Sequence, residues 1–158
     1  MINSAAIMNA LETHALQLGH FSNVNGHEPK SPPQVRDQIN LSFWAGVIQP
    51  VQSSGLQSLS YRWEIVGRVY MSADSEPADA IDPALVDVTF ALLTSLAGDF
   101  TLDSSIGGSQ RTRCVDFLGM DGKPLEATPG YFDYDGATLR TMDIIIPLII
   151  NDVTDLGA

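Results

Sequence analysis

Alternation of apolar and polar side chains from Leu59 to Met71 is the feature that most restricts the fold of this chain. Every second residue there is apolar, a period typical of a β-strand with one face on a core. The residues between them are mostly polar, which predicts an antiparallel strand whose second face meets water. Gly67 falls on the apolar face and predicts a bulge or a close neighbour. The apolar face carries Leu59, Tyr61, Trp63, Ile65, Val69 and Met71, and the other face carries Ser60, Arg62, Glu64 and Arg68.

Two more long strands are expected. The segment Leu41–Val51 is predicted to be a strand that Pro50 stops. The last strand, Leu139–Ile150, is apolar on both faces from Ile144 onward, which favours burial on both sides or cover by another chain. Pro147 lacks an amide donor and therefore belongs at an edge or a bulge.

Two segments have the apolar spacing of amphipathic helices. The first includes residues 7–18 and ends at Gly19. The second has Asp82 as a candidate N-cap, Pro83 as its first helical residue and Gly98 at its end. Its stripe is predicted to pack against the sheet and consists of Leu85, Val88, Leu92 and Leu96, widened by Val86, Phe90 and Leu93.

These elements predict an α+β fold with one mixed or antiparallel β-sheet and two main helices packed on one face. The length of 158 residues is ordinary for one domain, and the chain has no repeat and no second hydrophobic core. We therefore expect residues 1–158 to form a single domain.

The residue types that carry chemistry do not cluster. His14, His20 and His27 have no partner at the spacing of a zinc site. Cys114 lies in a predicted strand without a nearby histidine and is expected to be a small buried hydrophobic residue. The segment Asp133–Gly136 lacks most ligands of a calcium loop and is predicted to be a hairpin turn. We expect no catalytic site, no cofactor and no metal.

Acidic residues dominate the charge. Nineteen Asp and Glu against eight Lys and Arg give a net charge of −11, which excludes the usual tight binding of nucleic acid through phosphate neutralisation. The stretch Ser72–Ser105 contains acids and no base, so it is either a solvated face or a surface that must not bind a polyanion. No signal peptide is recognised, and the apolar run Ile144–Ile150 is far shorter than the ~20 residues that cross a bilayer. Neither secretion nor membrane insertion is expected.

Five segments in collinear order carry a resemblance to a known family. They are HEPKSPP at 27–33, IQPVQSSGLQSLSYRWEIVGRVYM at 48–71, EPADAIDPALVDVTFALLTSLAGDF at 76–100, VDFLGMDGKPLEATPGYFDYDG at 115–136 and RTMDIIIPLIIND at 140–152. Together they resemble the tail terminator proteins, also called minor tail or tail completion proteins, of long-tailed phages that infect actinobacteria. The resemblance spans nearly the whole chain and depends on the ordered set, because no single segment is a catalytic signature.

The resemblance implies a small subunit similar in fold to the terminators of lambda-like phages. Such subunits form a hexameric ring on the head-proximal end of the tail tube, stop its polymerisation and join it to the head connector. The implied partners are other copies of the chain, the tail tube protein and the head–tail connector proteins, while genomic DNA passes through the bore without specific binding. The implied location is the virion tail, assembled in the host cytoplasm, and the family has no catalytic residues.

Two sets of residues are candidates for these roles. The first is acidic and is expected on the inner wall or rim of the ring, where weak repulsion of DNA helps its passage: Asp74, Glu76 and Asp79. The second lies in two loops expected to make assembly contacts, Gln49–Ser58 and Asp121–Tyr134. Their candidate residues are Gln52, Ser53, Ser54, Gly55 and Gln57 in the first loop, and Asp121, Lys123 and Tyr131 in the second.

Two other functions remain open at this point. A tail tube subunit or a connector adaptor would also be a virion protein, but a tube subunit polymerises without limit whereas a terminator stops at one ring. A small enzyme or ligand-binding domain would need a concave pocket with convergent polar groups, for example around His20, His27 and Asp133.

Overall fold

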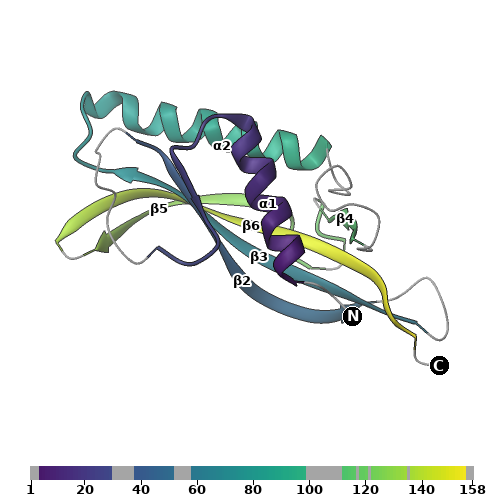
Figure 1. Cartoon of the computed structure of the whole chain (residues 1–158). Coiled ribbons are helices and arrows are strands. Elements are labelled where there is room, and N and C mark those ends of the chain that lie inside the picture. The colour runs from purple at the N-terminus through teal and green to yellow at the C-terminus, as the bar shows by residue number, and fades with distance from the viewer. Residues whose placement is uncertain are drawn as a thin grey trace.

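The chain forms one mixed β-sheet with two helices on one of its faces (Figure 1). The computed structural model describes residues 4–29, 38–51, 58–98, 112–116, 118–120, 122–134 and 136–155. The elements in chain order are α1 (Ser4–Leu18), β1 (Asn23–Asn25), β2 (Asn40–Val51), β3 (Ser58–Ser72), the 3-10 turn η1 (Ala78–Ala80), α2 (Ile81–Gly98), β4 (Thr112–Val115), β5 (Glu126–Tyr134) and β6 (Ala137–Asp155). The predicted α+β class is confirmed.

The sheet is built around β3 and β6, its two longest strands. Its six strands follow the order β1-β2-β3-β6-β4, and β5 pairs with β6 beside β4. Only the short pairing of β1 with β2 is parallel. Tyr61, Ile65 and Val69 of β3 face Ile150, Ile146 and Met142 of β6, and this register keeps the apolar side chains of both strands on the helix side.

The core lies between the sheet and the two helices. The predicted stripe of α2 supplies Leu85, Leu92 and Leu96, all at most 1% exposed, with Val88 partly buried beside them. They pack in one cluster with Trp63 and Ile65, as predicted. The remaining fully buried side chains of this cluster come from α1, β2, β3 and β6: Ile7, Leu11, Ala15, Leu41, Phe43, Val69, Ile144, Ile146 and Leu148.

A close neighbour explains the glycine on the apolar face of β3. A Cβ at Gly67 would lie 3.3 Å from the ring of Phe43, tighter than most contacts of that kind. The first helix ends as predicted, because Gly19 adopts a φ of +74°, a conformation that costs glycine little. Gly136 has a φ of +83° in the turn between β5 and β6, which confirms the predicted hairpin.

Two prolines lie inside strands. Pro50 was predicted to stop its strand, but β2 continues to Val51 and pairs Pro50 with Tyr61. Its missing donor is tolerated because β1 pairs only with Asn40–Ser42, so the outer side of β2 carries no described strand there. Pro129 was predicted to break the chain and instead lies within β5, an edge strand of the described sheet.

Pro147, predicted at an edge or a bulge, lies in β6 opposite Glu64 of β3. On the other side of β6, the pairing with β5 ends at Ile145 and the pairing with β4 begins at Leu148. The ladder is therefore interrupted beside Pro147, whose carbonyl accepts a hydrogen bond of 2.8 Å from the backbone amide of Asp116. A residue without an N–H fits such a gap.

The start of α2 and one side of it differ from the prediction. The helix begins at Ile81 after the η1 turn, so Asp82 lies in its first turn and is not an N-cap. Val86 and Phe90 were expected to widen the buried stripe, yet they are 37% and 66% exposed. They project from the side of the helix next to the sheet edge, where the core does not reach.

The segment Ala78–Ala97 is long and apolar enough, by length and composition, to cross a membrane. In this structure Leu85, Leu92 and Leu96 of the segment pack against the sheet. Part of its apolar content therefore belongs to the core of the domain.

Candidate assembly surfaces

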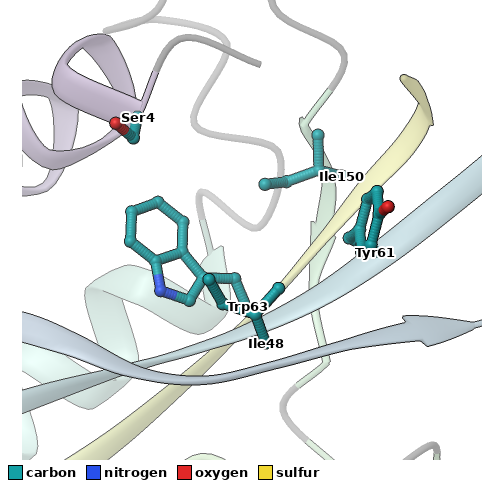
Figure 2. A pocket seen from close by; sticks show the side chains of 5 residues that line it. All are labelled: Ser4, Ile48, Tyr61, Trp63 and Ile150. Atoms are coloured by element: carbon teal, nitrogen blue, oxygen red, sulfur yellow. The ribbon is translucent and has the colours of Figure 1, made fainter. Parts of the chain in front are cut away.

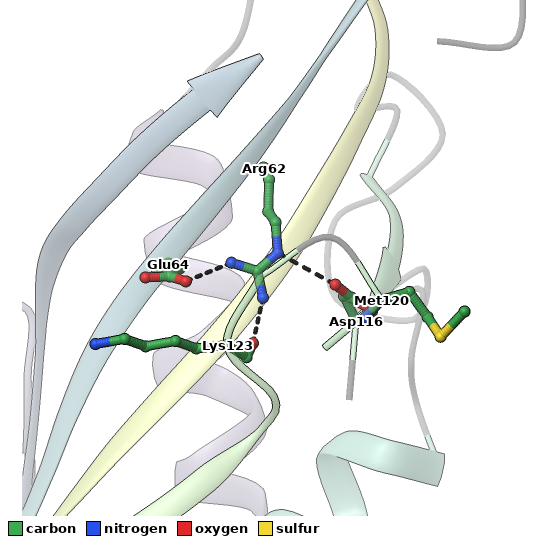
Figure 3. Close-up of polar contacts among 5 residues, drawn as sticks. All are labelled: Arg62, Glu64, Asp116, Met120 and Lys123. Atoms are coloured by element: carbon green, nitrogen blue, oxygen red, sulfur yellow. Dashed lines mark hydrogen bonds and ion pairs between the residues drawn. The ribbon is translucent and has the colours of Figure 1, made fainter. Parts of the chain in front are cut away.

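A buried arginine lies on the face of β3 that was predicted to meet water. Arg62 is 0% exposed, Ser60 is 0% and Glu64 is 8%, so that prediction is wrong for this part of the strand. Figure 3 shows the Arg62 guanidinium between two carboxylates and a carbonyl. Its Nε donates to Oδ2 of Asp116 at 3.1 Å, and its two terminal nitrogens donate to Glu64 and to the carbonyl oxygen of Lys123. The pairing of the charges is what makes their burial possible.

This cluster fixes the turn that follows β4. The Oδ1 of Asp116 accepts a hydrogen bond of 3.0 Å from the amide of Met120, and its carbonyl accepts one of 3.0 Å from the amide of Gly119. Gly119 has a φ of +71°, which favours glycine. A Cβ at Gly122 would lie 2.4 Å from the Arg62 guanidinium, so a side chain at that position would displace the arginine. The turn is thereby held against the sheet on the side opposite to the helices.

The anchored turn presents apolar side chains to solvent. Leu118 is 70% exposed and Met120 is 81% exposed, and Lys123 is exposed beside them. Lys123 was a predicted assembly residue, and its main-chain oxygen contacts Arg62. The predicted loop Asp121–Tyr134 is shorter than expected, because residues 126–134 form β5, and Asp121 lies outside the described residues.

Tyr131 is on the edge strand β5 rather than in a loop. It is 69% exposed and its ring lies 4.4 Å from the Arg140 guanidinium carbon. Arg140 also donates from Nε to Oδ1 of Asp82 at 2.9 Å and from Nη1 to the carbonyl of Gly130 at 3.1 Å. The hydrogen bond from Arg140 holds the pKa of the Asp82 carboxyl below its ordinary value. These contacts join the first turn of α2 to the β5–β6 hairpin.

An apolar pocket of about 90 Å³ lies at the start of α1, and Figure 2 shows its lining: Ser4, Ile48, Tyr61, Trp63 and Ile150. Trp63 is 6% exposed, and its Nε1 has no hydrogen-bond partner within the described part of the chain. A lining of this kind has none of the convergent charged groups of an active site. It suits hydrophobic contact, and Ile48 on its rim is 62% exposed.

A second apolar surface lies between α2 and β5. Its pocket has a volume of about 190 Å³ and is lined by Val86, Thr89, Phe90, Leu93, Ala127 and Met142. Thr89 turns its hydroxyl back to the carbonyl of Leu85 at 2.7 Å, so the polar atom is satisfied within the helix. The mostly apolar lining makes this groove a contact surface of the same kind.

The predicted acidic residues of the bore lie between β3 and α2. Asp74, Glu76 and Asp79 are all exposed, and the amide of Asp74 is bonded to the hydroxyl of Ser72 at 3.2 Å. A solvated face and a channel wall both require exposed carboxylates, so the exposure of these residues agrees with either role. The first predicted loop, Gln49–Ser58, is shorter than expected, because residues 49–51 belong to β2 and Ser58 begins β3. Its candidate residues Gln52, Ser53, Ser54, Gly55 and Gln57 lie outside the described residues.

The three histidines differ in their surroundings. His14 is 7% exposed and its Nε2 lies 2.7 Å from the hydroxyl of Ser95, a contact between α1 and α2, whereas His20 and His27 are exposed. Asp133 is exposed and accepts a hydrogen bond from Thr138, and neither pocket described above includes it. Across the described ranges, no group of three or more His, Cys, Asp or Glu residues is placed to hold a metal. The side chain of Cys114 lies outside the described part, and only its place in β4 is given.

Sequence reasoning missed the Arg62 cluster and the exposed apolar groups. A signal existed for the cluster, since Arg62 and Glu64 share one strand face, but Asp116 is 54 residues away and Lys123 is 61 residues away. The sequence alone does not show that residues so far apart in the chain come together; the strand topology does.

Comparisons with known proteins give a match at the level of fold. No family model matches the sequence, and no curated protein does. A chain in the virion of a native gene transfer agent (GTA) particle is similar in structure, with a TM-score of 0.54 and 12% sequence identity. The match covers 93% of this chain and 96% of that chain. The two chains therefore share their fold over almost their whole length.

Proposed function

We propose that this chain is a structural subunit of a phage-like virion, and specifically a tail terminator. The observation that carries the proposal is the end-to-end similarity of its fold to a chain of a GTA virion, at 93% and 96% coverage. A match of that extent covers most of both chains rather than one shared motif. The sequence resemblance to tail terminators, which spans residues 27–152, supports the same role independently of the fold.

The nature of the surfaces supports a role in assembly. Exposed apolar side chains of the described residues include Val47 and Ile48 on β2, Val86 and Phe90 on α2, and Leu118 with Met120 on the anchored turn, besides Leu16 on α1 and Tyr131 with Phe132 on β5. Contiguous apolar surface that is exposed on a protein marks sites of contact with other molecules. In a homomeric ring, hexameric by the resemblance, such groups meet other copies, the tail tube or the head connector.

The acidic turn before α2 has a separate part in the proposal. We place Asp74, Glu76 and Asp79 at the bore or its rim, where carboxylates let DNA pass without binding it. A variant with all three changed to Lys is expected to keep its fold and to bind DNA in a manner that weakens with added salt. If an image of the ring puts all three on the outer circumference, their role is solvation only.

Imaging of particles in which this chain carries a label tests the function. A terminator is expected as one ring at the head-proximal end of the tail. Label along the whole tube would identify a tube subunit, and label only on the connector would identify an adaptor.

A loop deletion gives a second test. A variant that lacks Gln52–Gln57 is expected to remain folded and to leave tails of uncontrolled length without heads. Normal tails joined to heads would show that this loop has no assembly role. A deletion variant that is unfolded by circular dichroism would be replaced by Gln52→Ala with Gln57→Ala.

A further inference from the structure

One edge of the sheet carries two adjacent apolar side chains in solvent. Beyond Ser42, the outer side of β2 has no partner among the described strands. The register of β2 shifts between Ala45 and Ile48, a β-bulge. Ile48 pairs with Trp63 and lines the same pocket, so it lies on the helix side of the sheet, yet it is 62% exposed because β2 is the outer strand of the described sheet there. Val47, 59% exposed, belongs to the bulge opposite Glu64, and Ile48 directly after the bulge is the apolar projection that we call the β2 knob.

The opposite edge carries a groove of matching chemistry. β5 lies on the far side of β6 from β3, and the groove of about 190 Å³ separates β5 from the exposed side of α2. Phe90, 66% exposed, and Val86, 37% exposed, belong to its lining together with Ala127 and Met142. We call this surface the α2–β5 groove.

The charge of the chain points to a second copy as the occupant. The net charge of −11 makes copies repel each other over most of their surface. Neither Gly46–Gln49 nor the residues that line the α2–β5 groove include an ionisable side chain. At these two places copies can approach with little direct repulsion between ionised groups, and burial of apolar surface favours the contact.

The two edge strands favour contact through side chains over continuous pairing of their backbones. Pro50 lies on β2 close to the knob, and Pro129 lies on β5. Proline and bulges on edge strands oppose edge-to-edge pairing, because they remove donors and twist the edge away. An apolar knob that enters a groove does not need those donors.

We propose that the β2 knob of one copy inserts into the α2–β5 groove of the next. This contact would join neighbouring copies in the proposed ring, and only the closure of the assembly into a ring rests on the proposed function. Since the knob and the groove lie on opposite edges of one sheet, the contact is heterologous: each copy uses its knob on one neighbour and its groove on another. Contacts of this type form a ring when the rotation between copies closes.

Disulfide trapping tests the contact directly. Two single variants, Ile48→Cys and Phe90→Cys, are mixed under mild oxidation at high protein concentration, with Cys114 present in every sample and the wild type as its background. The mixture is expected to give covalent dimers that neither variant gives alone. The double variant, with both changes in one chain, is expected to give a ladder of larger covalent oligomers. Leu16→Cys, at a position 55% exposed on α1, is the matched control and replaces Ile48→Cys in a parallel mixture.

Three results would overturn the proposal. The first is that Ile48→Cys alone gives as much covalent dimer as the mixture. The second is that the mixture with the Leu16→Cys control gives as much dimer as the mixture with Ile48→Cys, and the third is that the mixture gives no more dimer than the wild type. Failure of this experiment is separable from failure of the proposed function. If no covalent dimer is trapped but the wild-type chain is found capping tails, the proposed contact is wrong and the terminator role stands. If the double variant gives covalent ladders but the chain is absent from tails, the terminator role is wrong and the contact stands.

Discussion

Replacement of Arg62 by Met is expected to be the most destabilising change on the polar face of β3. Methionine keeps much of the length of the side chain and removes its charge. The carboxylates of Glu64 and Asp116 would then lose the positive charge that they share and would stay buried, since their side chains are only 11% and 6% exposed. Removal of one partner from a buried ion cluster costs about 3–5 kcal/mol. We expect a loss of that size in the free energy of unfolding.

Arg68→Met provides a matched control on the same face of the same strand. Arg68 binds Asp143 at 2.7 Å, but that carboxylate is 42% exposed and becomes hydrated when the arginine is lost. Such pairs contribute about 0–1 kcal/mol. The Arg68 guanidinium carbon also lies 5.3 Å from the Trp44 ring and 4.7 Å from the Phe132 ring, contacts of about 0.5–1 kcal/mol each at exposed sites. The control should therefore cost about 1–3 kcal/mol, less than Arg62→Met.

Urea denaturation followed by far-ultraviolet circular dichroism measures both variants against the wild type. Hydrogen exchange adds a local readout, because the amides of Gly119 and Met120 bond to Asp116. In Arg62→Met these two amides should exchange faster by a larger factor than amides in the centre of β6. Equal losses of stability in the two variants, or a loss below about 1 kcal/mol for Arg62→Met, would refute the idea that Arg62 anchors the turn.

Two further predictions concern the core and one surface ion pair. Leu92→Ala should lower the free energy of unfolding by about 2–5 kcal/mol in urea denaturation, because the side chain is fully buried between α2 and the sheet; a loss below about 1 kcal/mol would mean that this helix face is misassigned. The folded-state pKa of Asp82 is depressed by Arg140, so this carboxylate favours folding above its unfolded pKa, and the contribution is lost as the pH falls through the depressed value. Arg140→Met should thus be less stable than the wild type at neutral pH, and this gap should narrow in strong acid to what the contacts of Arg140 with Gly130 and Tyr131 contribute; a gap that stays constant with pH would contradict this.

Much of the fold could be predicted because its signals are local. The alternation that begins at Leu59 identified β3, and the spacing of Leu85, Leu92 and Leu96 identified the buried side of α2. The end of α1 at Gly19 and the hairpin turn at Gly136 could be predicted as well, because left-handed backbone conformations favour particular residues. Each of these features is decided by a residue and its near neighbours.

The features that sequence reasoning missed are decided by distant parts of the chain. Arg62 looks like a solvent-facing residue until the turn near Lys123 is folded over it. Phe90 looks like a core residue, since helical spacing alone does not show how far the sheet extends beneath α2. Ile48 is exposed although its partner Trp63 is buried, because β2 is the outer strand of the described sheet there, and only the pairing of the strands reveals this. Burial on the second face of a sheet and exposure at its edges are tertiary properties.

Arg62 and the two edge surfaces, the β2 knob and the α2–β5 groove, are expected to act at different stages: Arg62 in folding and the edge surfaces in assembly. Arg62 contributes to folding and lies out of solvent, whereas Ile48 and Phe90 are mostly exposed and contribute little to the stability of one copy. Ile48→Glu and Phe90→Glu should therefore change the free energy of unfolding by no more than about 0.5 kcal/mol, the range of ordinary surface substitutions. Each should still prevent the growth of oligomers, because a charge would have to be buried in the contact. Mixed together, however, the two variants retain one intact knob and one intact groove, and they should form a dimer that cannot extend. A dimer of this kind, found by sedimentation, follows only from a head-to-tail contact, and a symmetric interface would give none.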